Sequence, residues 1–340
     1  MRSAGDVRGL VEERLARFFE DKRVAALVLA PEAPELVDAV RGLTLRGGKR
    51  LRPALLVAAY EAVDASRPLE AVIDACCALE LLQTYLLIHD DWMDHDEERR
   101  GGLAVHAALR DAHGGDAHLG ASLAILAGNL ASACAWELLT RAHHDPALER
   151  SAITEFLEIH QQVVYGQQLD LIATEDVSRM QQLKTGSYTV RGPLLLGAAL
   201  AGATEAQRAA LLAFGQPLGE AFQMRDDLLG TFGEPSVIGK PTGGDLREGK
   251  RNALVREAEA RGTPRDLAPL RAVQGDASAS RSELAAAAAV IDAVGARVAV
   301  EARLEALLDE ARATLVDTPL SDAGVARLYE LADILTLRDR

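Results

Sequence analysis

Two clusters of aspartates carry the clearest chemistry, because helical spacing brings their members together. Asp90 and Asp94 are four residues apart at the end of a long apolar stretch, and Gln223, Asp226 and Asp227 fall at positions i, i+3 and i+4 of another. Side chains at this spacing lie about 5–6 Å apart, so paired carboxylates there need a cation. Carboxylate oxygens suit Mg²⁺, which shares its other positions with water and substrate phosphate. A solvated helix end is the alternative for either cluster alone.

Basic residues and glycines accompany these aspartates in a chain that is otherwise acidic. Lysine plus arginine number 37 against 51 aspartates plus glutamates, a formal net charge of −14. Glycine lets the backbone approach a phosphate, and arginine can bind two of its oxygens at once. Together the clusters predict two pockets for diphosphates, whereas a solvated surface is the alternative for each cluster alone. The basic residues concerned are Lys49, Arg50, Arg52, Arg99, Arg100, Lys184, Lys240 and Lys250.

Charge and composition exclude other classes of protein. A surface this acidic is repelled by nucleic-acid phosphates, so no nucleic-acid partner is expected. The hydrophobic fraction of 49% is ample for a large core. The three cysteines all lie in apolar stretches, which predicts reduced core residues and a cytoplasmic protein. The uncharged stretch 117–136 contains glycines and polar residues, so we expect a buried helix there rather than a stable membrane span.

The elements that must position these side chains are helices. Apolar residues recur at three- and four-residue spacing almost throughout, which predicts an all-α fold with one domain over residues 1–340. The segment 68–93 is apolar around much of its circumference, so it should lie at the centre and direct its terminal aspartates at a cavity. The helices are expected at residues 7–20, 33–45, 50–63, 68–93, 117–141, 146–173, 187–201, 204–231, 250–260, 279–295, 297–315 and 322–337.

The basic and aspartate-rich motifs, in their order along the chain, resemble those of the trans-isoprenyl diphosphate synthases, the polyprenyl synthetase family. The resemblance implies an isoprenoid-synthase helical bundle around a central apolar cavity, usually a homodimer. It also implies a transferase that condenses isopentenyl diphosphate head-to-tail with an allylic diphosphate through a Mg²⁺-assisted carbocation. The matching segments are the basic motif 47–53, the first aspartate-rich motif 90–101, the signatures 166–171 and 184–185, and the second aspartate-rich region formed by 222–227 and 239–250.

The same resemblance implies roles for individual residues. Asp90, Asp94 and Asp226 would hold Mg²⁺ bridged to the allylic diphosphate, and Thr185 and Gln223 would face the developing carbocation. The diphosphate oxygens would be bound by Arg99, Lys184 and Lys240 on the allylic side and by Lys49, Arg52, Gln83 and Arg100 on the isopentenyl side, with Asp227 and Lys250 as further substrate-binding residues.

Product length is expected to depend on Tyr85 and Leu86, which precede Asp90 by five and four residues. One aromatic residue at this place resembles short-chain enzymes that stop at geranylgeranyl (C20) or farnesyl (C15) diphosphate. The alternative is that Tyr85 is an ordinary core residue. Two positions depart from the family pattern, since Gly230 and Asn129 stand where aspartate is usual. We expect metal binding to survive the change at Gly230.

Two other functions compete with this interpretation. A class I terpene cyclase shares the fold and the first motif, but it has no second diphosphate to bind, so Lys49 and Arg52 argue against it. A non-catalytic partner subunit of a prenyl synthase is the second alternative, suggested by Gly230.

Overall fold

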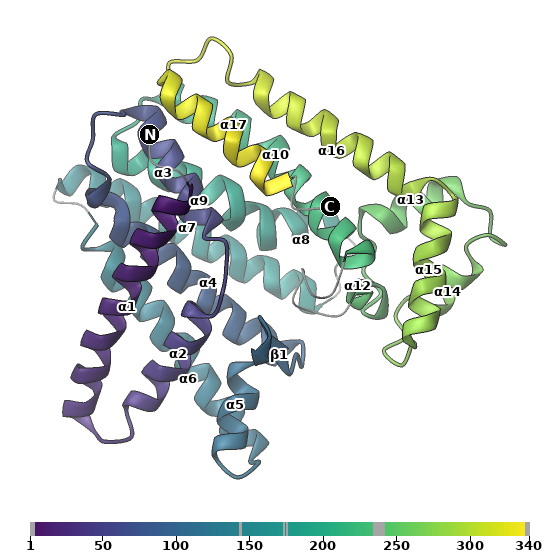
Figure 1. The fold of residues 1–340 in the computed structure, drawn as a ribbon, viewed down its shortest axis with the longest axis horizontal. Coiled ribbons are helices and arrows are strands. Elements are labelled where there is room, and N and C mark those ends of the chain that lie inside the picture. Colours follow the sequence, from purple (N-terminus) through teal and green to yellow (C-terminus); the bar gives the residue numbers. More distant parts are fainter. Residues whose placement is uncertain (1–3, 143–144, 173, 175, 234–241, 337–340) are drawn as a thin grey trace.

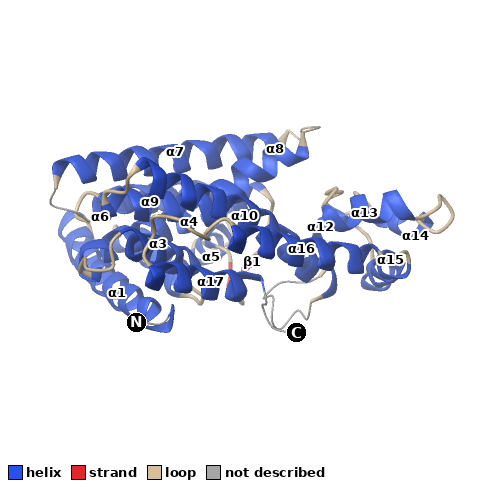
Figure 2. Cartoon of the chain, turned by 90° about the horizontal axis from the view of Figure 1, so that it is seen from above, coloured by secondary structure: helices blue, strands red, loops and turns tan. Residues whose placement is uncertain are grey.

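The computed structural model describes residues 1–340 except 1–3, 143–144, 173, 175, 234–241 and 337–340. Across the described residues the regular structure is helical, apart from one hairpin of two short strands (Figures 1 and 2). The predicted all-α fold is therefore confirmed.

The first half of the chain, purple to blue in Figure 1, builds the left side of the molecule and its lower end in that view. Its central helix is α4, which packs along α6 and also contacts α1, α2, α3 and α5. The elements are α1 (Ala4–Leu29), α2 (Pro34–Leu45), α3 (Leu51–Val63), the 3₁₀ helix η1 (Leu69–Val72), α4 (Ile73–Met93), β1 (Glu98–Arg99), β2 (Gly102–Leu103), α5 (Val105–Ala112) and α6 (Ala117–Leu139).

The second half runs from teal to yellow and ends in α16 and α17, which lie along α10 (Figure 1). The group α13–α15 projects to the right in this view. The elements are α7 (Pro146–Leu171), α8 (Val177–Gln181), the π-helix η2 (Gln182–Arg191), α9 (Gly192–Ala201), α10 (Glu205–Phe232), α12 (Gly244–Arg247), α13 (Ala253–Arg261), α14 (Ala268–Val273), α15 (Arg281–Ala293), α16 (Ala296–Ala313) and α17 (Asp322–Thr336).

The helix α4 lies at the centre because apolar residues surround most of its first four turns. Cys76, Cys77, Leu79, Leu81 and Leu82 are all buried, and burying side chains of this size is the main source of stability in such a bundle. All three cysteines are free and buried, as predicted. Toward its C-terminal end the helix leaves the core, and its last turn carries Asp90 and Asp91 to the site.

The buried helix predicted for 117–136 is α6, and it is buried along one side. Its apolar residues face the core on one side, but Ile125 and Leu126 are exposed. By length and composition, Leu69–Met93 and α6 could each cross a membrane, with 61% and 39% of the apolar window buried in the fold. Core helices of globular proteins can have the same length and apolar composition. The greater burial of Leu69–Met93 identifies it as such a core helix.

Several element boundaries differ from the predictions. The helix predicted for 7–20 continues to Leu29, because the alanines and leucines after the charged run 21–23 are strong helix formers. The segments α5, α8, α12, α14 and the first half of η2 are helical where no helix was expected. The short length of α5 and α14 and the Lys184–Gly186 sequence in η2 hide their helical period.

Candidate active site

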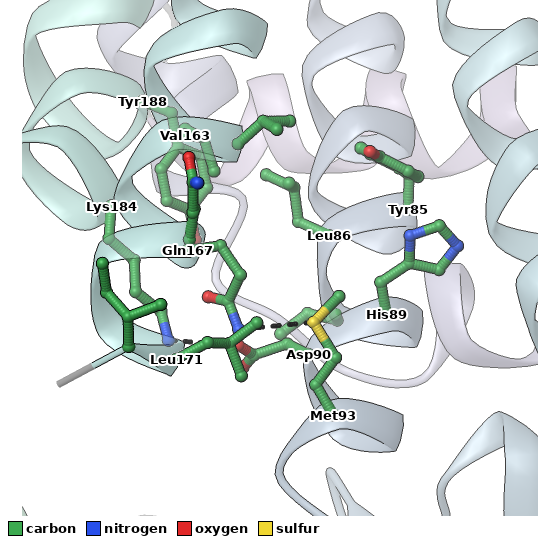
Figure 3. Close-up of a pocket in the computed structure, with 14 residues that line it drawn as sticks. Tyr85, Leu86, His89, Asp90, Met93, Val163, Gln167, Leu171, Lys184 and Tyr188 are labelled. Carbon is green, nitrogen blue, oxygen red and sulfur yellow. Dashed lines mark hydrogen bonds and ion pairs between the residues drawn. The ribbon is translucent and has the colours of Figure 1, made fainter.

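Two adjoining cavities lie among the described parts of α4, α7 and η2. One is apolar, with a volume of about 340 Å³, and is lined by residues of all three helices (Figure 3). The other is polar, with a volume of about 780 Å³. Leu171 and Lys184 line both, so the two spaces meet at these side chains. The polar cavity is also lined by Asp94, Asp170, Thr185, Gln223, Asp227, Asp245, Glu248, Lys250 and Asn252.

Lys184 lies between two carboxylates at the junction of the cavities. Its Nζ is 3.1 Å from Asp90 Oδ1 and 2.6 Å from Asp170 Oδ2, and Figure 3 shows it reaching from η2 toward Asp90 on α4. Burial lowers the pKa of Lys184, but the two carboxylates outweigh it and raise that pKa above its ordinary value. Lys184 is therefore a permanent cation here. Asp170 received no role from the sequence, although it lies within the 166–171 signature.

The approach of η2 to α7 depends on Gly166. A Cβ atom at Gly166 would lie 2.3 Å from the backbone nitrogen of Lys184, which no side chain could tolerate without moving the backbone. The π-helical segment is wider than an α-helix and is a form often found at functional sites. The absence of a side chain at Gly166 thus sets the depth at which Lys184 and Thr185 enter the cavities.

Asp94 faces the polar cavity from the end of α4. Among the described residues, none makes a hydrogen bond or ion pair with its carboxylate. Desolvation by the cavity walls, followed by the negative charge of Asp90, raises the pKa of Asp94 to about 6, against the opposing effect of Lys184 and Lys250. Such a carboxylate retains its oxygens for a ligand that enters the cavity.

The second aspartate region reaches the same cavity from α10. Asp227 is 2% exposed and accepts hydrogen bonds from Gln223 Nε2 at 2.9 Å and from the Ala253 amide at 3.0 Å. Burial raises the pKa of Asp227 to about 6. Asp226 precedes it on α10 and is half-buried. The two aspartate-rich regions, remote in sequence, therefore converge on one cavity.

Lys250 completes the far wall of the polar cavity. It forms an ion pair with Glu248, and its Nζ lies 4.0 Å from Asp245. Burial lowers the pKa of Lys250, but the bond to Glu248 reverses this effect and the net pKa is raised. Lys240, the other lysine predicted in this region, lies outside the described residues.

Arg99 is engaged by the protein's own carboxylates. Its Nε lies 2.6 Å from Asp91 Oδ1, and its Nη2 lies 2.8 Å from Asp96. Asp91 is fully buried, and burial raises its pKa to about 6 although Arg99 opposes the shift. Of the three aspartates at the end of α4, Asp91 thus orients the hairpin arginine, while Asp90 and Asp94 face the cavities.

The predicted isopentenyl-side residues come from three elements. Lys49 is exposed on the loop before α3, and Gln83 is half-buried on α4. Arg52 donates to Thr189 Oγ1 at 2.9 Å, and its guanidinium lies 4.3 Å from the Tyr188 ring centre, a cation–π contact. Arg100 donates to backbone carbonyls of the α2 end.

Tyr85 and Leu86 both line the apolar cavity, as Figure 3 shows. The Tyr85 ring meets His89 and His160 edge-on, with centroid distances of 4.8 and 5.1 Å. This places a cluster of three rings on one side of the apolar space.

The donor set fits a hard divalent cation. Within the described part of the chain, no three His, Cys, Asp or Glu side chains are close enough to hold a metal by themselves. Mg²⁺ does not require such a cage, since it commonly takes one or two carboxylates and fills its other positions with water and phosphate oxygens. Desolvation and the charge of Asp90 disfavour the ionised form of Asp94, and a bound cation would offset both effects.

A helical bundle with two aspartate-bearing helices above an apolar cavity defines the isoprenoid-synthase class of fold. The model of the polyprenyl synthetase family matches residues 33–291, and the chain belongs to this family. It is 34% identical, over 73% of its length and 74% of the relative, to a geranylgeranyl diphosphate synthase of Methanosarcina mazei. It is 33% identical, over 86% of its length and 80% of the relative, to a (2E,6E)-farnesyl diphosphate synthase of Mycobacterium bovis.

A solved structure agrees with these relatives. The geranylgeranyl pyrophosphate synthase from Corynebacterium glutamicum, complexed with isoprenyl diphosphate and magnesium, superposes with a TM-score of 0.90 at 33% identity. The match covers 98% of this chain and 99% of that one. The resemblance inferred from the motifs is confirmed: the protein is a trans-isoprenyl diphosphate synthase, a prenyltransferase of isoprenoid biosynthesis.

Proposed function

We propose that the protein condenses isopentenyl diphosphate with an allylic diphosphate at the junction of the two cavities. The observation that carries this proposal is the shared lining: Lys184 belongs to both the polar cavity with Asp94 and Asp227 and the apolar cavity with Tyr85. A diphosphate head in the polar cavity would leave its hydrocarbon tail in the apolar one.

The charged head of the allylic substrate would be bound by Asp90, Asp94 and Asp226 through Mg²⁺, and by Arg99, Lys184 and Lys240 directly. Magnesium, when bound, neutralises the diphosphate and makes it a better leaving group. The cations of this chain support the same charge, since preorganised positive groups around a departing anion commonly contribute several kcal/mol. Asp227 positions Gln223, and Lys250 adds positive charge on the opposite wall.

The proposed reaction needs no general base from the protein. The allylic C–O bond breaks to give diphosphate and an allylic cation, the double bond of isopentenyl diphosphate attacks that cation, and the released diphosphate takes the proton lost from the product. Thr185 and Gln223 face this region with polar groups, and the apolar lining excludes water that would quench the cation. Lys49, Arg52, Gln83 and Arg100 would bind isopentenyl diphosphate throughout.

The product is proposed to be geranylgeranyl diphosphate, with farnesyl diphosphate as the shorter possibility. The Tyr85 ring in the lining of the apolar cavity, packed edge-on against His89 and His160, supports a short product, because a bulky ring there limits the space for the tail. We also propose that residues 1–340 act as one domain, that the enzyme is a homodimer without a membrane span, and that it works in the cytoplasm. The free, buried cysteines support a reducing cytoplasm, and the apolar residues exposed on α6 and α7 support a homodimer.

The function is tested by incubating purified protein with Mg²⁺, isopentenyl diphosphate and each allylic starter in turn, followed by chromatography of the dephosphorylated alcohols. Geranylgeraniol is expected, and Asp94→Asn should abolish it. Hydrocarbon released from an allylic diphosphate alone would support a terpene cyclase instead. No elongation, together with stimulation of a second synthase, would support a non-catalytic partner subunit.

A further inference from the structure

The arginine at the end of α2 is bonded to the hairpin that carries the diphosphate-binding arginines. Arg46 Nη1 donates to the carbonyl oxygen of Arg99 at 3.1 Å and to that of Leu103 at 2.9 Å. These two carbonyls flank the turn of the hairpin, so one guanidinium holds both strands. We propose that Arg46 is a positioning residue that fixes this hairpin, and with it Arg100, in the geometry that binds isopentenyl diphosphate. The inference rests on the proposed role of Arg100.

Arg100, in the turn of the hairpin, also forms hydrogen bonds to the end of α2. Arg100 Nη1 donates to the carbonyls of Leu43 and Arg46 at 3.3 and 3.4 Å. The backbone of Arg100 has a φ of 53°, and Gly101 follows with 73°. Arginine is disfavoured in this left-handed region. Hydrogen bonds around the turn must therefore stabilise the conformation of Arg100. The bonds of Arg46 on either side of the turn supply that restraint.

The restrained guanidinium lies beside the loop that carries Lys49. A Cβ at Gly48 would be 3.7 Å from Arg100 Nη1, which places the two basic segments side by side. Burial, together with the charges of Arg50 and Arg52, lowers the pKa of Arg100. Cations gathered in this way repel each other, so their arrangement depends on the bonds that hold each one in place until an anion enters.

Gly102 gives an independent way to disturb the same link. A Cβ at Gly102 would lie 2.6 Å from Arg46 Nη1, so the guanidinium occupies the place of a side chain there. The φ of Gly102 is outside the left-handed region, and alanine is therefore acceptable to the backbone. Gly102→Ala should displace the Arg46 guanidinium without removing its charge from the protein.

The experiment compares Arg46→Met, Gly102→Ala and the double variant with the wild-type enzyme. Each is expected to raise the KM for isopentenyl diphosphate about tenfold, because misplacing a binding group by a fraction of an ångström has effects of this order. The allylic KM and kcat should change less than about threefold, because the guanidinium of Arg99, on the same hairpin, is held separately by Asp91 and Asp96. The double variant should be no worse than either single one, since both remove one link. Arg46→Lys, which retains one donor to the carbonyls, should recover part of the loss.

Two variants on the same helix serve as matched controls. Arg41→Met removes an arginine of α2 that pairs with Glu20 rather than with the hairpin. Gly42→Ala adds a Cβ that meets nothing within 4 Å. Both should leave the two KM values unchanged.

Amide hydrogen exchange over residues 98–103 supplies a readout that does not depend on catalysis. It should become faster in Arg46→Met and in Gly102→Ala and stay unchanged in the controls. Unchanged exchange, or an equal rise in both KM values, overturns the positioning role of Arg46. If Arg100→Ala itself leaves the KM for isopentenyl diphosphate unaltered, the assigned role of Arg100 fails and the inference fails with it, whatever the exchange data give.

Discussion

The aspartates of the site differ in their partners, although their motifs make them look equivalent. Asp91 is buried against Arg99, Asp90 lies beside Lys184, and Asp227 accepts from Gln223 and the Ala253 amide. Asp94 keeps its oxygens directed at the polar cavity. A carboxylate already saturated by cationic or amide donors binds a metal less readily than one that is not. The hydrogen bonds of Asp91 and Asp227 therefore indicate structural roles, whereas Asp94 is available for a metal, and Asp90 would have to share its carboxylate between the metal and Lys184.

Tyr85 gives the sharpest prediction at this scale. Tyr85→Ala removes the ring that meets His89 and His160 beside the apolar cavity, so the tail should extend further and the product should lengthen. The measurement is chromatography of the dephosphorylated products with a farnesyl starter. Tyr85→Phe retains the ring and should leave the distribution unchanged. An unaltered product from Tyr85→Ala would place the floor elsewhere and leave Tyr85 as a core residue.

At the scale of elements, α3 is anchored by an ion pair within the protein. Arg50, which precedes α3, pairs with Glu80 of α4 and donates to the Thr44 carbonyl at 2.8 Å. Both charged side chains are almost fully buried, with exposed fractions of 1% and 3%. The basic motif therefore contains one arginine that stabilises the fold, next to Lys49 and Arg52, the two residues proposed to bind isopentenyl diphosphate.

Removing one partner of this pair should destabilise the protein strongly. Glu80→Leu removes the buried partner of the Arg50 charge and leaves it only the longer contact with Glu12, at 3.6 Å, and removing one partner of a buried ion pair typically costs about 3–5 kcal/mol. Urea denaturation followed by circular dichroism at fixed protein concentration measures the change. Glu257→Gln, which breaks an exposed pair with Arg261, should alter stability by less than about 0.5 kcal/mol. Equal effects of the two substitutions would contradict a structural role for Arg50.

Most elements and the convergence of the two aspartate regions could be predicted from sequence, because long helices repeat their apolar pattern over many turns. The π-helix η2 could not, since its five-residue hydrogen bonding leaves no familiar period and Lys184–Gly186 reads as a break. The roles of Arg46 and Asp170 could not be predicted for another reason. Their partners, the hairpin carbonyls and Lys184, are distant in sequence, and nothing in the local residue types indicates those contacts.

At the scale of the whole molecule, two long helices leave apolar side chains in solvent. Ile125 and Leu126 on α6 are 38% and 52% exposed, and Val164 and Tyr165 on α7 are 44% and 58% exposed. Large apolar residues exposed together mark interaction surfaces. A second copy of the chain is the occupant expected for the proposed homodimer. Because Val164 also lines the apolar cavity, a partner at this position would cover one side of that cavity.

The dimer is tested by placing charge on this surface. Ile125→Asp and Leu126→Asp should each convert the dimer to a monomer, because an unpaired carboxylate buried in an interface costs several kcal/mol. Sedimentation velocity at several protein concentrations measures the change. Val298→Asp, at a residue of α16 that is 65% exposed, should leave the association state as it is. A wild-type protein that sediments as a monomer would rule out the proposed assembly.

The π-helix η2 contributes to the proposed sites of both diphosphates from one short segment of backbone. Lys184 and Thr185 line the polar cavity, while Tyr188 and Thr189 of the same segment hold Arg52. A compound that binds beside this segment and displaces it would lower the affinity for both reactants without resembling either. Such an inhibitor would raise the KM of both reactants at once, and because each reactant would in turn weaken the binding of the inhibitor, a high concentration of either one would relieve the inhibition.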